Sequence, residues 1–126
     1  MQMNLCLSGL AGCYGKVAYP AVVEEAVARI REARPDAATF NEVCRSDIAR
    51  IARRTGYRLR FSRVIYRGER LRCVRPGGRG LFGNAVLTEA AVERTDSQDV
   101  GTQAGIERRR WLCVSTRAGV DVCTAI

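Results

Sequence analysis

Hydrophobic and polar residues alternate at the start of the chain, and this alternation predicts a first β-strand over residues 1–7. A glycine-containing loop is expected at residues 9–15. Pro20 suits the first turn of a helix that should run to about Ala33, because a first turn leaves its N–H groups unpaired and proline has none. One face of this helix is apolar and should be buried. It carries Val23, Ala26, Val27 and Ile30.

A second strand and helix are predicted after the break at Pro35. Residues 37–43 are almost all apolar, which is typical of a short strand buried on both faces. A helix should follow from Ser46, whose side chain can cap its first turn, to about Arg54. Gly56 can end this helix, because glycine adopts the left-handed backbone conformation without strain. The residues expected to face inward are Ile48, Ile51 and Ala52.

The second half of the chain is predicted to consist mainly of strands. Apolar residues that alternate with arginines indicate a third strand, which begins at residue 57 and can continue to residue 66. Residues 67–80 are basic and rich in glycine, which is typical of a loop. Further strands are expected at residues 81–87 and at about 91–94, whereas residues 95–106 are polar and weakly patterned.

A β-hairpin is predicted at the C-terminal end, with strands at residues 109–116 and 120–125. A three-residue turn, Arg117-Ala118-Gly119, would join them. This turn would pair Val114 with Val122, Leu112 with Thr124 and Cys113 with Cys123. The paired cysteines would then be close enough for a cross-strand disulfide, whereas a two-residue turn would break the pairing.

Strand, helix, strand and helix followed mainly by strands define an α/β fold with a mixed β-sheet and two helices on one face. The 126 residues, 47% of them hydrophobic, suit one packed domain or part of a larger one. Because the chain ends on a strand, we expect nothing to cover the second face of the sheet. The sequence contains neither an apolar stretch of about 18 residues nor a signal peptide.

Six cysteines are many for this length, and their number is even. The chain has no Cys-x-x-Cys pair and no histidine, so a structural zinc site is not expected. Disulfides in a secreted or otherwise extracytoplasmic protein are one interpretation. Buried free cysteines are the alternative. The sequence alone does not reveal which cysteines would pair.

The net charge is +8, and almost all of the positive charge is arginine, since Lys16 is the only lysine. Arginine has a planar guanidinium that suits phosphate groups, so a basic surface favours polyanionic partners such as nucleic acid. The alternative is a set of ordinary solvated helix faces, because the sequence contains no long basic block.

Glu42 is the first candidate for chemistry, because it ends a buried strand just before a helix. Open α/β sheets often place functional groups at this kind of junction. A carboxylate there can bind Mg²⁺, which prefers oxygen ligands. Asn4, on the first strand, could reach the same end of the sheet. By itself, a glutamate at a strand end is equally explained as a helix cap or an ion-paired surface residue.

Several short motifs, taken together in their order along the chain, make the functional prediction more specific. They are Met3-Asn4-Leu5, Asn41-Glu42-Val43, Gly83-Asn84-Ala85-Val86-Leu87, and a hairpin that begins after Arg108-Arg109-Arg110 and ends at Val122-Cys123-Thr124. Across essentially its whole length, the chain resembles the endonuclease/exonuclease/phosphatase family, which includes pancreatic-type deoxyribonuclease. The resemblance implies the N-terminal half of a four-layer α/β sandwich. It also implies metal-dependent hydrolysis of phosphate esters, with Mg²⁺, Mn²⁺ or Ca²⁺ as the cofactor.

The resemblance also implies roles for individual residues. Glu42 takes the place of the catalytic, metal-binding glutamate, and Asn4 takes that of an asparagine near the metal. Asn84 matches a motif asparagine whose role is structural or in contact with a substrate phosphate. Arg45 is a candidate phosphate contact, with a solvated arginine at a helix start as the alternative. Asn41 departs from the family pattern, which usually has glutamine before the glutamate.

The larger departure is the absence of histidine. Ile126 stands near the position where the resemblance implies a catalytic histidine, and the later aspartates of the family have no counterpart. We therefore expect residues 1–126 to form one incomplete domain that is inactive alone. The alternatives are a basic module that binds polyanions without catalysis, and one half of a two-chain assembly. An uncovered sheet face would favour a partner chain or self-association.

Overall fold

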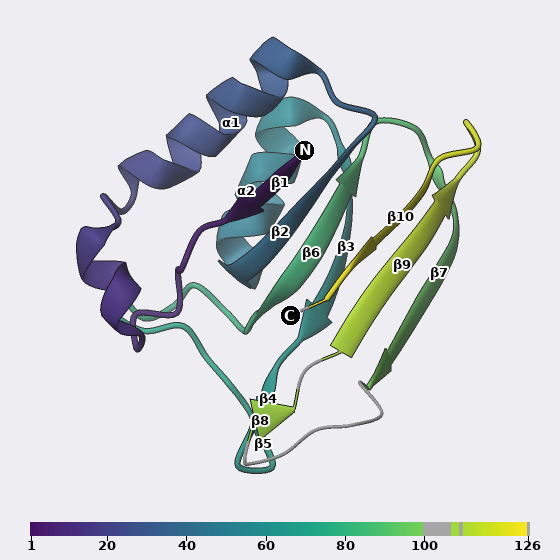
Figure 1. The fold of residues 1–126 in the computed structure, drawn as a ribbon. Helices are drawn as coiled ribbons and strands as arrows, with labels where there is room; N and C mark the ends of the chain where they lie inside the picture. Colours follow the sequence, from purple (N-terminus) through teal and green to yellow (C-terminus); the bar gives the residue numbers. More distant parts are fainter. Residues whose placement is uncertain (100–106, 109, 126) are drawn as a thin grey trace.

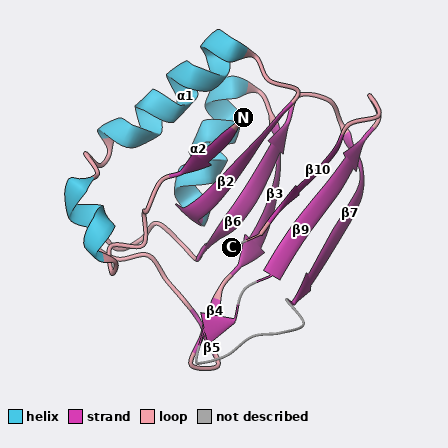
Figure 2. Ribbon diagram, in the orientation of Figure 1, coloured by secondary structure: helices cyan, strands magenta, loops and turns pink. Residues whose placement is uncertain are grey.

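The computed structural model describes residues 1–99, 107–108 and 110–125, which form three stacked layers (Figures 1 and 2). Two helices lie on one face of a four-stranded sheet, and a three-stranded sheet packs on its other face. The mixed α/β class with both helices on one face was predicted from the sequence and is confirmed.

The four-stranded sheet has the strand order β1-β2-β6-β3. Its strands are β1 (Gln2–Asn4), β2 (Ala37–Cys44), β3 (Arg58–Arg63) and β6 (Phe82–Thr88). β1 and β2 run parallel, while β6 runs antiparallel to both of its neighbours. Every residue of β6 is buried, because this central strand is covered on both faces.

Helices α1 (Ala21–Ala33) and α2 (Arg45–Thr55) cover one face of this sheet. The residues predicted to face inward on both helices are buried. Gly56 ends α2 with a positive φ of 78°, as expected. The predicted cap was wrong, since α2 begins at Arg45 and no side chain caps it. Instead, the backbone N–H groups of Arg45 and Ser46 donate to the carbonyls of Leu81 and Arg79, which satisfy the free N–H groups of the first turn.

The second sheet has the strand order β10-β9-β7. Its strands are β7 (Val92–Asp99), β9 (Arg110–Thr116) and β10 (Asp121–Thr124). The hairpin register predicted from the sequence is confirmed for all three pairs, including Cys113 with Cys123. β7 is longer than the predicted strand, because its polar residues pair with β9 as far as Asp99. Residues 100–106, 109 and 126 lie outside the described part of the chain.

The expectation that one sheet face would stay uncovered was wrong. The β9–β10 hairpin folds over the four-stranded sheet, and Val86 of β6 packs against Leu112 and Val114 of β9. All three side chains are at most 2% exposed. The local pattern predicted the strands but not the sheet to which they belong, so the prediction of a partner loses this support.

The remaining elements are short. A small sheet is formed by β4 (Ile65–Tyr66), β5 (Glu69–Arg70) and β8 (Glu107–Arg108), so part of the predicted 67–80 loop is a strand. A 3-10 helix, Gly12–Lys16, lies within the predicted glycine-containing loop. None of the helices in the described residues is both long and apolar enough to cross a membrane.

All six cysteines lie in the described residues and form disulfides, so the alternative of free cysteines was wrong. The pairs are Cys6–Cys13, Cys44–Cys73 and Cys113–Cys123. The last is the cross-strand disulfide predicted from the hairpin register. Three disulfides in a small domain are typical of proteins from oxidising, extracytoplasmic compartments.

Candidate metal and phosphate site

Glu42 lies in a β-bulge near the carboxyl end of β2. The pairing with β6 shifts between Phe40 and Val43, so Asn41 and Glu42 together lie opposite Asn84. Glu42 has a φ of 58°, which is uncommon for a residue with a side chain. A bulge interrupts the alternation of a strand and redirects its side chains. Here it leaves the Glu42 side chain partly exposed, whereas Asn41 is buried.

Neighbouring groups hold this bulge in place. The backbone N–H of Glu42 donates to Oδ1 of Asn84 at 3.3 Å. Its carbonyl accepts from the backbone N–H of Leu7 at 2.9 Å, in the segment that follows β1. Asn84 is 1% exposed, so its amide replaces a ladder bond that the bulge removes. The structural role implied for Asn84 fits this position, and a phosphate contact through it stays a prediction.

A second buried hydrogen bond ties the two sheets together at the same end. Thr124 of β10 donates from Oγ1 to Oδ1 of Asn41 at 2.8 Å, and both residues are buried. Sequence reasoning treated Asn41 only as a departure from the family pattern and gave Thr124 no role at the site. The sequence contained little signal for this bond, because each strand carries other polar residues, such as Glu42 on β2 and Asp121 on β10.

Asn4 ends β1 and pairs in register with Asn41 on β2. Its Oδ1 accepts a hydrogen bond from the backbone N–H of Cys6 at 3.1 Å. A carbonyl oxygen has two lone pairs, so one remains for a cation or water. The Sγ of Cys6 also lies near the Glu42 carboxylate. Cys6 therefore links the two predicted metal ligands, Asn4 and Glu42.

The donor set decides which metal the site fits. Ligand atoms of Cys6, Cys13 and Glu42 lie within 4.8 Å of one another. The two sulfurs are joined in a disulfide, so neither is the thiolate that a soft metal requires. Glu42 is then the one charged oxygen ligand in this cluster of described residues. Mg²⁺ accepts one or two carboxylates and completes its shell with water, so the oxygens of Glu42 and Asn4 have the donor chemistry that Mg²⁺ prefers, while their roles as metal ligands stay predictions.

Arg45 lies exposed at the start of α2, and its guanidinium lies 5.4 Å from the centre of the Phe61 ring. Such a contact leaves the guanidinium N–H groups free to meet an anion. Phe61 belongs to β3, on the far side of β6 from Glu42. The phosphate contact predicted for Arg45 is therefore directed toward the β3 side of the sheet.

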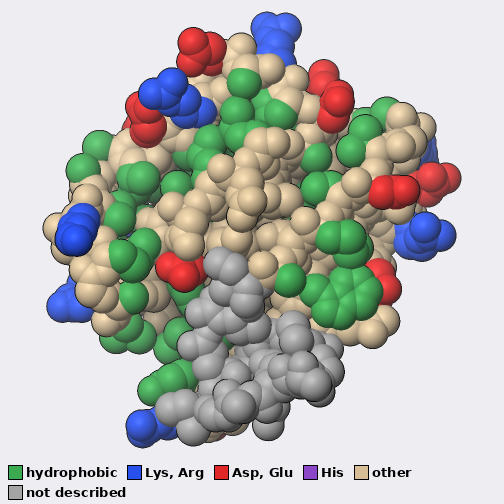
Figure 3. Space-filling model, in the orientation of Figure 1, with side chains coloured by type: hydrophobic (Ala, Val, Ile, Leu, Met, Phe, Trp, Pro, Cys, Tyr) green, Lys and Arg blue, Asp and Glu red, His purple; other side chains and the backbone are tan. Residues whose placement is uncertain are grey.

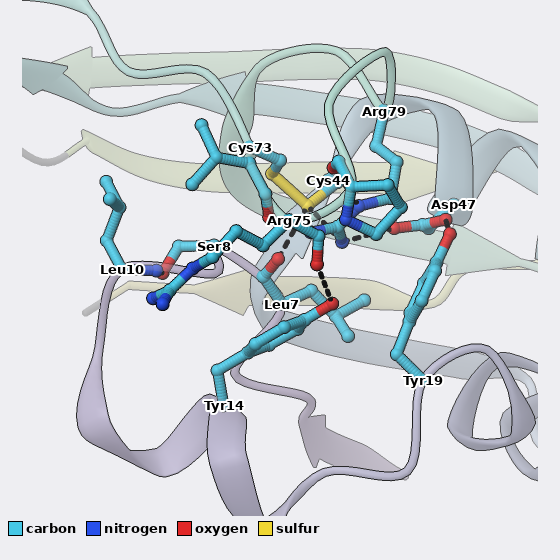
Figure 4. Close-up of polar contacts among 12 residues, drawn as sticks. Leu7, Ser8, Leu10, Tyr14, Tyr19, Cys44, Asp47, Cys73, Arg75 and Arg79 are labelled. Atoms are coloured by element: carbon cyan, nitrogen blue, oxygen red, sulfur yellow. Dashed lines mark hydrogen bonds and ion pairs between the residues drawn. A yellow bond between two sulfur atoms is a disulfide. The ribbon is translucent and has the colours of Figure 1, made fainter.

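Arg79 lies in the glycine-rich part of the predicted 67–80 loop, but it is buried rather than solvated (Figure 4). Its side chain is 5% exposed and pairs with Asp47 at 3.1 Å. The same guanidinium donates to the carbonyls of Val74 and Pro76 at 2.7 and 3.0 Å. Protein groups therefore hold this arginine inside the fold, where it anchors the loop to α2.

Two tyrosines complete this network from the N-terminal segment. The Arg79 guanidinium lies over the rings of Tyr19 and Tyr14, 4.5 and 5.5 Å from their centres. Tyr19 donates its hydroxyl to Asp47 at 2.8 Å, and Tyr14 donates to the carbonyl of Arg75 at 2.6 Å (Figure 4). Burial, followed by the hydrogen bond to the Asp47 carboxylate, raises the pKa of Tyr19 to about 12.

Part of the basic charge is neutralised on the helices, as the alternative of solvated helix faces predicts. Arg29 pairs with Glu25 at 2.8 Å, and both side chains are 60% exposed. Arg50 and Arg54 of α2 both pair with Glu24 of α1, each at 2.7 Å. In Figure 3, basic and acidic side chains lie close together along the upper rim, over α1. These ion pairs account for some of the arginines but not for those on β3, β5 and β9.

The fold matches that of an endonuclease/exonuclease/phosphatase from Beutenbergia cavernae DSM 12333, known from its crystal structure. The TM-score is 0.62 at 18% sequence identity, over 97% of this chain and 36% of the other. This chain therefore spans about a third of the length of that neighbour. No family model matches the sequence, and a search of curated proteins finds no match either. The likeness shows the fold, while membership of the endonuclease/exonuclease/phosphatase family, and of its pancreatic-type deoxyribonuclease branch, stays a prediction.

Proposed function

We propose that this chain carries the metal-binding part of a phosphoester hydrolase of the endonuclease/exonuclease/phosphatase type. The bulge in β2 carries the proposal, since it directs the Glu42 carboxylate to the sheet end where Asn4 lies, in a chain with this fold. A positive φ at a residue other than glycine persists where the surroundings hold it, and such residues gather at functional sites.

Each residue has a distinct part in this proposal. Glu42 provides the charged oxygen ligand and Asn4 a neutral one. Asn84 fixes the backbone of Glu42, and Thr124 fixes Asn41 beside it. When bound, Mg²⁺, or Mn²⁺ or Ca²⁺ in its place, would stabilise charge on a phosphoryl oxygen and activate water.

We propose further that the chain alone turns over little substrate. It contains no histidine to act as a general base. No additional aspartate or glutamate joins the cluster of Glu42, Cys6 and Cys13 within the described residues. The missing groups would come from outside the described chain, for instance from a partner chain or a second copy. The three disulfides support an extracytoplasmic location for this activity.

Binding of Mn²⁺, followed by electron paramagnetic resonance, tests the metal site directly. Glu42→Gln keeps the size of the side chain and removes its charge. Glu25→Gln is the matched control, because Glu25 is an exposed carboxylate on α1. We expect Glu42→Gln to weaken Mn²⁺ binding by about tenfold or more, as loss of metal-site groups commonly does. Equal binding by the two variants would contradict the proposal.

Turnover of a generic phosphodiester with Mg²⁺ tests the second part of the proposal. We expect little hydrolysis by the chain alone. Robust turnover that Glu42→Gln abolishes would support the metal site and overturn the proposed inactivity. Robust turnover that Glu42→Gln leaves unchanged would overturn the assignment of Glu42.

A further inference from the structure

A groove of about 420 Å³ lies along β3, the edge strand of the four-stranded sheet. Three arginines line it, namely Arg63 of β3, Arg70 of β5 and Arg110 of β9. The remaining lining residues are two serines and the apolar side chains of Phe61 and Leu81. No acidic residue is among the described residues that line the groove. Three segments far apart in the sequence thus bring cationic side chains to one hollow.

The base of the groove is fixed by hydrogen bonds. The Oγ atoms of Ser62 and Ser97 lie 3.2 Å apart and link β3 to β7. Arg110 donates from Nε to Oγ of Ser97 at 3.2 Å and from Nη2 to its carbonyl at 2.7 Å. The Arg110 guanidinium is therefore held at the edge where the two sheets meet. A cation that is fixed before the ligand arrives loses little freedom on binding.

The other two arginines are available to a ligand. Arg63 and Arg70 are exposed, and their side chains have no hydrogen bond or ion pair within the described residues. Phe61 lines the same groove, and the Arg45 guanidinium lies over its ring. Arg63 and Arg70 have no acidic residue among the described lining residues of the groove, so their charges raise the local potential and attract anions.

The groove also has a defined position relative to Glu42. Ser62 of β3 pairs in register with Asn84 of β6, and Asn84 bonds the backbone of Glu42. Two strand spacings separate β2 from β3, which is roughly 10 Å at about 4.8 Å per spacing. A nucleic acid strand covers this distance in about three nucleotides at 3.4 Å each.

We propose that this arginine groove binds phosphates of a nucleic acid strand that flank the phosphate placed at Glu42. The inference rests on the proposed function for the position of the central phosphate, while binding in the groove does not depend on it. Three arginines in one groove, roughly 10 Å from the strand that carries Glu42, suit a ligand with repeated phosphates. A lipid surface is less well matched, because Met1 and Leu10 are the exposed large hydrophobic residues of the described chain.

Fluorescence anisotropy with a labelled single-stranded oligonucleotide of about eight nucleotides tests the groove. The measurement uses the full chain with a metal chelator, so that binding is observed without hydrolysis. The test variant is Arg63→Gln with Arg70→Gln. The control, Arg53→Gln with Arg117→Gln, removes the same charge from exposed arginines that do not line the groove. Circular dichroism and thermal melting verify that both variants are folded.

We expect the groove variant to bind about tenfold more weakly at 50 mM salt and the control to stay close to the wild type. Each lost phosphate contact should also reduce the slope of log K against log salt by about 0.7. Binding of a dinucleotide should be nearly unaffected, because one phosphate cannot reach both positions. Equal losses of oligonucleotide affinity in the two variants, or an unchanged salt slope, would contradict phosphate binding in the groove and would indicate only a general charge effect.

Glu42→Gln separates this inference from the proposed function. It should not weaken oligonucleotide binding in the presence of chelator, since the groove residues remain and a negative charge near the phosphates is removed. If Glu42→Gln binds Mn²⁺ normally but the groove variant still loses oligonucleotide affinity, the metal-site proposal is contradicted and the groove inference is supported. If Mn²⁺ binding requires Glu42 but the groove variant binds the oligonucleotide as well as the control does, only the groove inference is contradicted.

Discussion

Oδ1 of Asn84 accepts a hydrogen bond from the backbone N–H of Glu42 at 3.3 Å, across the gap that the bulge opens between β2 and β6. The donor belongs to the predicted metal ligand, and the acceptor is a side chain 42 positions later in the chain. A buried amide thus determines the position of a partly exposed carboxylate. The position of Glu42 depends on its neighbouring strand as much as on its own.

Asn84→Ala tests this dependence. The substitution leaves the Glu42 N–H without its partner in the interior, so we expect a loss of about 1–3 kcal/mol in the free energy of unfolding. Mn²⁺ affinity should also fall, although both predicted ligands remain. Urea denaturation and Mn²⁺ titration measure the two effects. Thr88→Val is the control, because it removes the hydrogen bond that another buried residue of β6 donates to the carbonyl of Ala90, at the other end of the strand from Asn84. Wild-type Mn²⁺ affinity in Asn84→Ala would contradict the positioning role.

The buried ion pair between Arg79 and Asp47 leads to a prediction about stability. Both side chains are at most 7% exposed. Arg79→Met would leave the Asp47 carboxylate buried without its cation, which typically costs about 3–5 kcal/mol. Arg29→Met is the matched control, because Arg29 belongs to an exposed pair that should contribute about 1 kcal/mol or less. Chemical denaturation gives both values, and similar losses would show that Arg79 has no special structural role.

The sequence predicted local features well where one physical pattern dominated. The pairing of Val114 with Val122 followed from apolar alternation and a three-residue turn, and the structure has that register. The buried faces of both helices followed from helical periodicity in the same way. Glu42 was predicted to be a metal ligand because a charged residue at the end of an apolar strand is unusual. The short motifs along the chain supported the same prediction.

Features that depend on distant contacts could not be predicted. Arginine is usually exposed, and the partners that bury Arg79 lie as far away as Asp47 and Tyr19. Alternation along the C-terminal hairpin indicated strands but gave no information about which sheet they would join. The arginine groove was missed for the same reason, since β3, β5 and β9 meet there only after folding.

The three disulfides should differ in their contribution to stability. Cys44–Cys73 closes a separation of 29 residues and Cys113–Cys123 one of 10. On the chain-entropy model, these loops correspond to about 4 and about 3 kcal/mol. Cys44 is also fully buried, and its Sγ accepts a hydrogen bond from Arg79 at 3.3 Å. Replacing Cys44 and Cys73 by alanine should therefore destabilise the fold more than replacing Cys113 and Cys123.

Thermal and chemical denaturation of the two double variants, under the same oxidising conditions, measures this difference. The hairpin variant serves as the control for loss of a disulfide without disturbance of the interior, because Cys123 is exposed. A larger loss in the hairpin variant would show that the Arg79 network does not depend on Cys44–Cys73.

The hydroxyl of Tyr19 should ionise late in an alkaline titration. Burial and the hydrogen bond to Asp47 raise its pKa from 10.0 to about 12. The folded pKa lies above the unfolded value, so this group's contribution to stability is complete below about pH 10. It is lost as the pH rises from 10 to about 12, because the charged phenolate is disfavoured beside the Asp47 carboxylate. Burial also raises the pKa of Tyr57, with the nearby charge of Glu89 as the next cause.

Absorbance of tyrosinate as a function of pH measures this effect, because the chain has four tyrosines. We expect two late-titrating hydroxyls, those of Tyr19 and Tyr57, and the ionisation of Tyr19 should coincide with the loss of native circular dichroism. Tyr19→Phe should remove the Tyr19 component and leave the others in place. Tyr57→Phe is the control, since its hydroxyl donates to the carbonyl of Pro35 and not to a carboxylate. Late titration that is unchanged in Tyr19→Phe would show that Tyr19 is not the residue held protonated by Asp47.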